Sequence, residues 1–265
     1  MMFRNFEPKK AAELIWNSWE NGNLIDKLPS KFVPKTKLEA YNVQQVYESF
    51  SKSPLFGWKI AATSKAGQSH IGVKNPLIGR ILKEKVFVHN TTIKNSKNNM
   101  SVAEPEIAFR FKNDLFPKKE SYTDDEILQA VGTMHPAIEL PDSRFKNFSN
   151  VGEFILIADN ACAHQFIIGP KMSEEWRVTN LSELKISIRS SNGSVNRGSG
   201  SNVLGSPYLA LNWLVNELSK NNITIKKGQY ISTGTCAKPL NFSPGDKITA
   251  DYGKLGQIFT IIDEK

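Results

Sequence analysis

Residues 104–111 read Glu-Pro-Glu-Ile-Ala-Phe-Arg-Phe, and this stretch indicates how the chain folds. Its short apolar run favours a β-strand, on which successive side chains point to opposite faces. Glu104 and Glu106 would share one face, while the isoleucine and both phenylalanines would line the other. The pattern predicts a strand with one apolar face toward a core and an acidic pair on the opposite face.

The two glutamates would repel each other on the inward side of a curved sheet. At ~5 Å and an effective dielectric constant of roughly 20, such a carboxylate pair costs on the order of 3 kcal/mol. A bound cation would remove that cost. The same spacing also fits a strand face in water with Arg110 as a surface partner, so the pair alone leaves both interpretations open.

A third acidic residue lies alone in the apolar run Ala137-Ile138-Glu139-Leu140. Three carboxylates without His or Cys partners suit a hard cation such as Mg²⁺ or Mn²⁺, with water or substrate completing an octahedral shell. Glu139 is therefore a candidate third ligand beside Glu104 and Glu106.

A lysine interrupts a second apolar stretch, because residues 57–62 read Gly-Trp-Lys-Ile-Ala-Ala. Burial would lower the pKa of the Lys59 ammonium group and allow this residue to shuttle a proton. A lysine on the solvent-facing side of a strand gives the same pattern. The residues alone leave both roles open.

The composition is that of a folded globular protein. The chain has 265 residues, of which 40% are hydrophobic and 23% charged, well away from the composition of disordered chains. This length predicts one large domain, with or without a small N-terminal piece. The net charge is +8, but the lysines are scattered, so we expect neither nucleic acid nor a membrane surface as the main partner.

Two cysteines, Cys162 and Cys236, exclude a disulfide framework and a cysteine-built zinc site. Both have apolar or small neighbours, as expected of free thiols in a reducing compartment. The four histidines lack the spacing of metal ligands. No apolar stretch is long enough to span a bilayer, so we expect a soluble, cytoplasmic protein.

Apolar spacing and turn residues predict helices first and mostly strands afterwards. Helices are expected at residues 8–22, 36–50, 123–131 and 206–218. Strands are expected at residues 58–62, 85–89, 104–111, 137–140, 154–158, 230–234, 247–251 and 257–262, with a hairpin at 185–197 that turns at Asn192-Gly193. We therefore predict an α+β fold dominated by a curved mixed sheet.

Three other places in the sequence are candidate sites. The glycine-rich loop at residues 198–205 precedes a helix and could attract an anion, but a hairpin precedes it, which favours a backbone-permissive turn. The amides of Thr233-Gly234-Thr235 could hold a carboxylate or form an ordinary turn. His164 is interpreted as a packed core histidine. The sequence contains no Gly-x-Ser-x-Gly elbow, the motif that would indicate nucleophilic catalysis by a serine.

Several separated motifs match one known family in that family's order, from about residue 41 to the end. They are Tyr41-Asn42-Val43-Gln44, Gly57-Trp58-Lys59-Ile60-Ala61-Ala62-Thr63-Ser64, residues 104–109, Pro136-Ala137-Ile138-Glu139, Asp142-Ser143-Arg144, Ala158-Asp159-Asn160, Val203-Leu204-Gly205 and Thr233-Gly234-Thr235. The chain resembles the 2-oxopent-4-enoate (2-hydroxypenta-2,4-dienoate) hydratases and their sister 2-oxo-3-hexenedioate decarboxylases, both of the fumarylacetoacetate hydrolase superfamily.

The resemblance implies a fumarylacetoacetate-hydrolase-like mixed β-roll and homo-oligomers built from dimers. It implies an N-terminal helical region at residues 1–56 and a metal-binding catalytic domain at residues 57–265. It also implies a role for each of eight residues. The metal ligands would be Glu104, Glu106 and Glu139, the catalytic lysine Lys59, and the substrate-binding residues Thr63, Ser64, Arg144 and Thr235.

The implied activity is that of a divalent-metal-dependent lyase, using Mg²⁺ or Mn²⁺, that adds water to a small unsaturated 2-oxo acid in aromatic-compound catabolism. The substrate's carboxylate and 2-oxo oxygen would chelate the cation, and Lys59 would shuttle the proton during ketonisation. The sister decarboxylases share this first half and then release CO₂, which gives the alternative function. A further alternative is a family member that has lost catalysis and acts as a binding protein.

Two positions depart from the hydratase pattern. Leu77 stands after Pro76, where hydratases usually carry an acid, and its side chain cannot activate or orient water. Cys162 stands where hydratases commonly have Ser. An apolar residue at the first position is frequent in the decarboxylases and favours that alternative. A decarboxylase must also hold a distal carboxylate, for which Lys74 or Arg80 could supply the charge.

Overall fold

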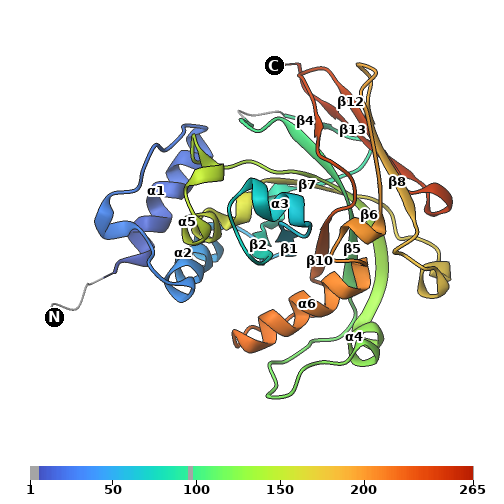
Figure 1. Ribbon diagram of the computed structural model, residues 1–265, viewed down its shortest axis with the longest axis horizontal. Helices are drawn as coiled ribbons and strands as arrows, with labels where there is room; N and C mark the ends of the chain where they lie inside the picture. Colours follow the sequence, from blue (N-terminus) through green and yellow to red (C-terminus); the bar gives the residue numbers. More distant parts are fainter. Residues whose placement is uncertain (1–5, 95–97, 265) are drawn as a thin grey trace.

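Two curled β-sheets form the body of the molecule, with one group of helices at one side and further helices below and between the sheets (Figure 1). The computed structural model describes residues 6–94 and 98–264. The architecture is the predicted mixture of helices and mixed sheets, so the α+β prediction is confirmed.

The first two helices form where the sequence predicts them. Helix α1 (Pro8–Asn21) has a proline in its first turn and ends at Gly22, whose φ of 64° suits the left-handed cap. Helix α2 (Lys37–Phe50) begins after Thr36, whose hydroxyl accepts a hydrogen bond from the N–H of Glu39. Local capping chemistry therefore determines both helix boundaries.

The larger sheet has eight strands, and its two central members are the longest. It contains β1 (Gly57–Ala61), β2 (Leu77–Ile81), β3 (Val86–Val88), β5 (Val102–Phe111), β6 (Val131–Leu140), β7 (Gln165–Ile168), β10 (Tyr230–Thr235) and β11 (Leu240–Asn241). The strand order is β2-β1-β10-β5-β6-β7-β3, and β11 also pairs with β5. Pairing of β1 with β10 and of β3 with β7 is parallel, so the sheet is mixed.

The smaller sheet has five strands and lies beside the larger one. It contains β4 (Thr92–Ile93), β8 (Lys185–Ser190), β9 (Val195–Ser199), β12 (Lys247–Asp251) and β13 (Gln257–Ile262), in the order β4-β13-β12-β8-β9. Helices α4 (Asp124–Ala130) and α6 (Pro207–Lys220) lie below the sheets in Figure 1. The main core includes Ile107, Phe109 and Phe111, all fully buried, as the alternating pattern predicts.

One predicted strand is wrong. Residues 154–158 belong to helix α5 (Glu153–Ala158). The carbonyl of Gly152 accepts from the N–H of Leu156, and that of Ile155 accepts from Asp159, which closes helical turns. A run of five apolar residues fits a buried helix as well as a buried strand, and periodicity cannot separate the two.

Several short elements carry too weak a pattern to be predicted. Helix α3 (Lys65–His70) is only one and a half turns long, and Ser64 caps its first turn through the N–H of Gly67. Strands β2 and β7 were also missed, because burial on both faces removes the alternation that marks a strand.

The N-terminal helices pack tightly against the rest of the molecule. The Gln44 side chain donates to the carbonyls of Ile78 on β2 and Ile157 on α5, at 2.8 and 2.9 Å. The Tyr47 hydroxyl donates to the carbonyl of Ala158 at 2.6 Å. The division into residues 1–56 and 57–265 stays a prediction.

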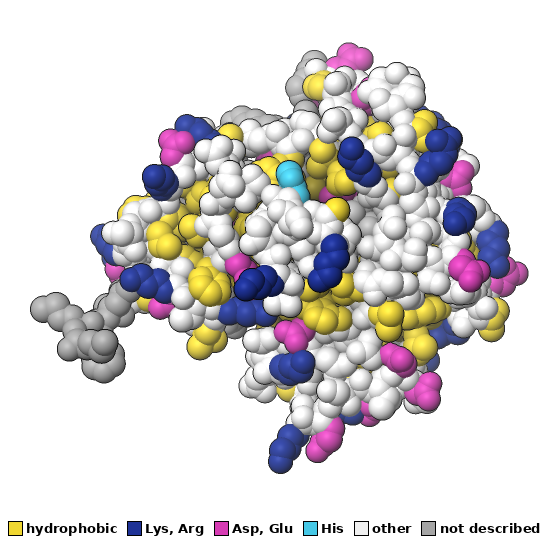
Figure 2. Space-filling model, viewed as in Figure 1, with side chains coloured by type: hydrophobic (Ala, Val, Ile, Leu, Met, Phe, Trp, Pro, Cys, Tyr) yellow, Lys and Arg dark blue, Asp and Glu magenta, His cyan; other side chains and the backbone are white. Residues whose placement is uncertain are grey.

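Charged side chains of both signs are dispersed over one face of the molecule. On the face shown in Figure 2, lysine and arginine side chains lie singly or in small groups among acidic ones. None of the helices in residues 6–94 and 98–264 has the length and apolar character that a membrane span requires. The absence of a nucleic-acid partner stays a prediction.

His164 is a packed core histidine, as predicted, and its burial makes stability depend on pH. It is 8% exposed, and its Nδ1 accepts from the Trp19 indole N–H at 2.6 Å. Burial, aided by the charge of Arg144, lowers the pKa of His164 from 6.5 to about 3. The unfolded chain therefore binds an additional proton between these two pH values, and folding weakens as pH falls through that window.

We expect the free energy of unfolding to fall by about 2 kcal/mol more between pH 7 and pH 5 in the wild type than in His164→Gln. Glutamine lacks the titrating ring, so this contribution disappears in the variant. Urea unfolding at a series of pH values measures the difference. Equal pH dependence in the two proteins would contradict the burial of a neutral His164.

Candidate metal centre

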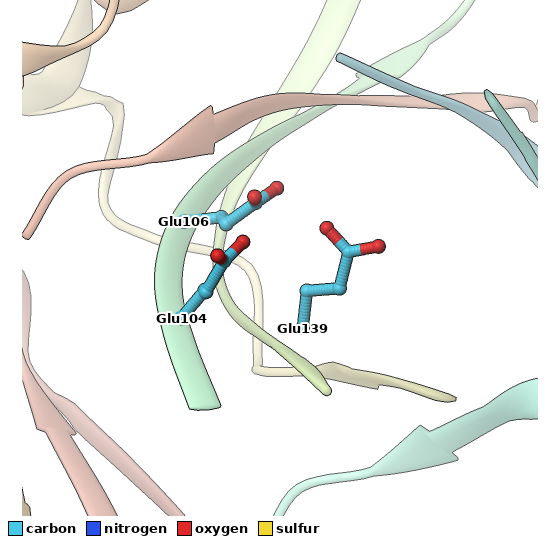
Figure 3. A group of neighbouring side chains, drawn as sticks. All are labelled: Glu104, Glu106 and Glu139. Carbon is cyan, nitrogen blue, oxygen red and sulfur yellow. The ribbon is translucent and has the colours of Figure 1, made fainter. Parts of the chain in front are cut away.

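Three glutamate side chains meet where β5 pairs with β6 (Figure 3). Glu104 lies directly opposite Glu139 in the antiparallel register, and Glu106 lies opposite Ala137. One carboxylate oxygen of each glutamate lies within 4.8 Å of the others. Glu106 and Glu139 are 0% and 2% exposed, and Glu104 is partly buried. The alternative of a strand face in water is therefore excluded.

The cluster is electrostatically strained as it stands. Burial raises the pKa of Glu104 to about 7, with repulsion from Glu139 adding to the rise and Lys59 opposing it. Burial, again with repulsion from Glu139, holds the pKa of Glu106 well above its ordinary value. In Glu139 burial raises the pKa against the attraction of Lys59. The group resists carrying three negative charges unless a positive charge joins it.

Strand β10 orients Glu106 from the other side. The Ser232 hydroxyl and the Gly234 N–H both donate to Glu106 Oε2, the latter at 3.3 Å. The β5–β10 register shifts between Ser232 and Thr235, and this irregularity allows both donors to reach one carboxylate. The predicted carboxylate-binding amide of residues 233–235 thus holds a carboxylate of the protein itself. Ser232 was missed, because a serine within a strand carries no signal of its own.

Lys59 lies between the glutamates and a loop. Its ammonium group is 3.0 Å from Glu139 Oε2 and donates to the Ala161 carbonyl at 3.1 Å. Its exposure is 2%, so the solvent-facing interpretation is excluded. Burial lowers the pKa of Lys59, but Glu139, Glu106 and Glu104 outweigh it and raise the pKa to about 12. The expected direction of this shift was therefore wrong.

The loop that contacts Lys59 has an unusual backbone. Asn160, Ala161 and Cys162 have φ angles of 56°, 50° and 59°, so three consecutive non-glycine residues are left-handed. Such a conformation costs about 1–2 kcal/mol per residue. The surrounding contacts must supply this free energy. We call residues 160–162 the left-handed turn.

Buried groups hold the left-handed turn on both sides. The Asn160 side chain accepts from the N–H of Arg80 at 2.7 Å and donates to its carbonyl at 2.8 Å. Arg144 Nε donates to Asp159 Oδ1 at 2.6 Å, and its other nitrogens donate to the carbonyls of Asp142, Asp159 and Ala163. Arg144 is 2% exposed. Its predicted contact with substrate stays a prediction, and its contacts in the structure are with the protein.

The other predicted substrate-binding residues lie near the ends of β1 and β10. Thr63 is 6% exposed, and its side chain lies so near Gly234 that a Cβ there would come within 2.7 Å of it. The Thr235 hydroxyl donates to the Ala237 carbonyl at 2.7 Å. The Ser64 hydroxyl caps α3. Thr235 is therefore the last residue of β10, the strand that orients Glu106, and Thr63 lies close to that strand. The roles of Thr63, Ser64 and Thr235 stay predictions.

Of the two departures from the hydratase pattern, Leu77 packs beside the left-handed turn and Cys162 is the last residue of that turn. Leu77 is 1% exposed and packs in an apolar cluster with Val73, Ile157 and Ala161. Cys162 as a residue is half-buried. Burial of its thiol group is the main reason that the pKa of this thiol is raised to about 12. The structure thus places an apolar surface where the hydratase pattern has an acid.

Arg80 and Lys74 differ in their surroundings. The Arg80 guanidinium lies 4.7 Å from the centre of the Trp58 ring and pairs with Glu48 at 2.7 Å. Because Trp58 and Lys59 are neighbours on one strand, they face opposite sides of the sheet. Arg80 therefore lies across the sheet from Lys59. Lys74 is exposed.

The donor set suits a divalent cation. Its three side chains offer only carboxylate oxygens, which hard cations prefer. Glu106 Oε1 is buried and receives no hydrogen bond from any residue that the structure describes. A cation in contact with these oxygens would provide that missing partner and cancel the repulsion among the carboxylates.

A family model, the fumarylacetoacetate hydrolase C-terminal domain, matches residues 50–262. The chain belongs to the fumarylacetoacetate hydrolase family. The resemblance that the motifs indicate and the expected β-roll fold are therefore confirmed.

Named relatives divide between two activities. The chain is 27% identical over 255 residues to a 2-keto-4-pentenoate hydratase of Paraburkholderia xenovorans (strain LB400), covering 95% of this chain and 93% of the relative. It is 28% identical over 250 residues to a 4-oxalocrotonate decarboxylase of Pseudomonas putida, covering 93% of each. A solved structure of 4-oxalocrotonate decarboxylase from Pseudomonas putida G7, complexed with magnesium and adipate, aligns with a TM-score of 0.86 at 27% identity over 98% of this chain and 100% of that chain.

Metal binding should stabilise the protein by an amount that grows with the logarithm of the free metal concentration. With Mg²⁺ at a hundredfold excess over its dissociation constant, we expect Tm to rise by about 5–10 °C. EDTA should reverse this rise. Glu106→Gln keeps the side-chain shape but removes one buried charge, so its metal-free form should be at least as stable as the wild type while its response to Mg²⁺ is lost. An unchanged response in this variant, measured by calorimetry, would exclude Glu106 as a ligand.

Proposed function

We propose that the protein is a divalent-metal-dependent lyase that adds water to a small unsaturated 2-oxo acid of the 2-hydroxypenta-2,4-dienoate type. The observation that carries this proposal is the buried cluster of Glu104, Glu106 and Glu139 with the Lys59 ammonium group 3.0 Å from Glu139. Similarity to hydratases over almost the whole chain supports it. Mg²⁺ or Mn²⁺ is the proposed metal, and the solved decarboxylase structures contain magnesium or calcium.

Each group of the site has a defined task in this proposal. When bound, the cation would polarise the 2-oxo group and stabilise the negative charge of an enolate. The three glutamates would hold it, and Ser232 and the Gly234 amide would keep Glu106 in place. A cation shared among the carboxylates would also weaken the attraction that raises the pKa of Lys59. Lys59 would then be able to move the proton of the substrate's 2-hydroxyl group.

A decarboxylase acting on 2-oxo-3-hexenedioate is the second candidate. The specific observation that favours it is Leu77, which is buried in an apolar cluster instead of presenting an acid to water. The similarity to the solved decarboxylase points the same way. Of the two basic residues considered for a distal carboxylate, Arg80 lies across the sheet, so Lys74 is the one we propose.

The broader setting is proposed from the family. Homo-oligomers built from dimers, a cytoplasmic location and a part in aromatic-compound catabolism stay predictions. The small carboxylate substrate is supported by the relatives' names, which describe 2-oxo acids.

The products distinguish the two reactions. We expect purified protein with Mg²⁺ to convert 2-hydroxypenta-2,4-dienoate to 4-hydroxy-2-oxopentanoate. Liquid chromatography with mass detection measures the formation of this product. Release of CO₂ from 2-oxo-3-hexenedioate, with no hydration, would establish the decarboxylase instead. No turnover of either acid by metal-loaded, folded protein would favour the non-catalytic alternative.

Loss of Lys59 should slow the chemical step. We expect Lys59→Met to lower kcat by about 10²–10⁴-fold, because proton transfer by a positioned side chain contributes that much. Lys226→Met, which makes the same substitution at an exposed lysine outside the glutamate cluster, is the matched control and should keep full activity. Equal kcat in the wild type and Lys59→Met would remove Lys59 from the mechanism.

A further inference from the structure

We propose that Arg144 and Asn160 are positioning residues, which hold the left-handed turn so that the Ala161 carbonyl fixes the Lys59 ammonium group against Glu139. Only the catalytic meaning of this arrangement rests on the proposed function. The arrangement itself is carried by contacts among buried groups of the chain.

The Ala161 carbonyl is one of two acceptors that define where the ammonium group lies. Lys59 Nζ donates to it at 3.1 Å and lies 3.0 Å from Glu139 Oε2. A lysine side chain has four rotatable bonds, so one acceptor leaves it free to rotate, whereas two acceptors on different elements restrict it. The direction of the Ala161 carbonyl depends in turn on the left-handed backbone around it.

Arg144 holds the start and the end of the turn together. Its guanidinium donates to the Asp159 carboxylate and carbonyl on one side and to the Ala163 carbonyl, at 3.0 Å, on the other. The Ser143 hydroxyl donates to the same carboxylate at 2.6 Å. Both partners of the ion pair are buried, at 2% and 0% side-chain exposure. A planar group with several fixed donors makes this link, and a lysine could not reproduce it.

Asn160 ties the turn to β2, which is the neighbour of the strand that carries Lys59. Its side chain pairs with both backbone groups of Arg80. Lys59 lies opposite Gly79 in the β1–β2 register. A Cβ at Gly79 would come within 2.6 Å of the Asn160 carbonyl oxygen and 2.9 Å of Lys59 Cδ. The glycine therefore permits the turn and the lysine to approach each other.

This position of Arg144 gives it a role different from substrate binding. Its donors are directed to Asp142, Asp159 and Ala163, and the guanidinium lies 4.4 Å from the centre of the Trp19 ring. An arginine that binds substrate affects KM, whereas one that positions Lys59 affects kcat. The two roles can be measured separately.

Three variants loosen the turn in different ways. Asn160→Ala removes both side-chain hydrogen bonds to β2. Arg144→Lys keeps the positive charge opposite Asp159 but loses the hydrogen bonds that join the carbonyls of Asp159 and Ala163. Gly79→Ala forces the left-handed turn and Lys59 apart. We expect each to lower kcat by about 10- to 100-fold, with KM for the 2-oxo acid and the affinity for Mg²⁺ unchanged. Asn160→Asp keeps the acceptor for the Arg80 N–H and should restore part of the loss.

A matched control is available at the end of α6. Asn222 also has a left-handed backbone, with φ of 58°, but it lies on the surface. Asn222→Ala should leave kcat unchanged, because it removes the same side chain from the same backbone conformation without touching Lys59.

A second readout uses metal-free protein and needs no activity. The ¹⁵N signal of the Lys59 ammonium group, assigned by its absence in Lys59→Arg, should shift or broaden in Asn160→Ala and Gly79→Ala and stay unchanged in Asn222→Ala. This measurement tests the positioning even if the proposed lyase activity is absent.

Two results would overturn the inference. A folded Asn160→Ala protein with the wild-type Lys59 signal and wild-type kcat would show that the turn does not position the lysine. A raised KM with unchanged kcat in Arg144→Lys would assign Arg144 to substrate binding instead. If Arg144→Lys does not fold, Asn160→Ala and Gly79→Ala decide the question alone.

Discussion

Repulsion among buried carboxylates is the constraint on which this structure depends. The antiparallel register of β5 and β6 places Glu104 opposite Glu139, and Glu106 lies two residues further along the same face. A like-charged pair directly opposite on neighbouring strands destabilises a sheet. Here the arrangement persists because strong cross-strand pairing holds the backbone, while Lys59 and the donors on β10 offset part of the repulsion. A cation would offset the rest, so the same geometry that costs the sheet stability would favour the binding of a metal.

The two faces of the larger sheet have different roles, since one packs into the core and the other carries the candidate site. The face with Ile107 and Phe109 packs into the main core and stabilises the fold. The other face carries the glutamates, and the left-handed turn covers Lys59 there. Because side chains alternate along a strand, a single residue of register shift would exchange core and site. Stability and candidate function therefore depend on the same strand register.

Much of this organisation was predictable from the sequence, and the failures have physical causes. Alternation along residues 104–111 predicted both the core face and the acidic pair, and Glu139 stood out as a lone acid in an apolar run. The motifs predicted the family. The left-handed turn was not predictable, because only Asn160 is of a type that favours positive φ, whereas Ala161 and Cys162 are not, and the stabilising partners of the turn lie elsewhere in the chain. The direction of the Lys59 pKa shift was wrong because it depends on three charges that only the fold brings together.

The contact between Trp19 and Arg144 links the first helix to the interior of the site. The Arg144 guanidinium lies over the indole ring, whose N–H bonds to His164, and Tyr47 of the second helix packs edge-on against the same ring. The N-terminal helices thereby keep water from the ion pair that supports the left-handed turn. Amide hydrogen exchange in α1 and in the left-handed turn should consequently occur through one shared opening event. A chain that lacks α1 would lose order around Lys59, although α1 contributes no residue to the glutamate cluster.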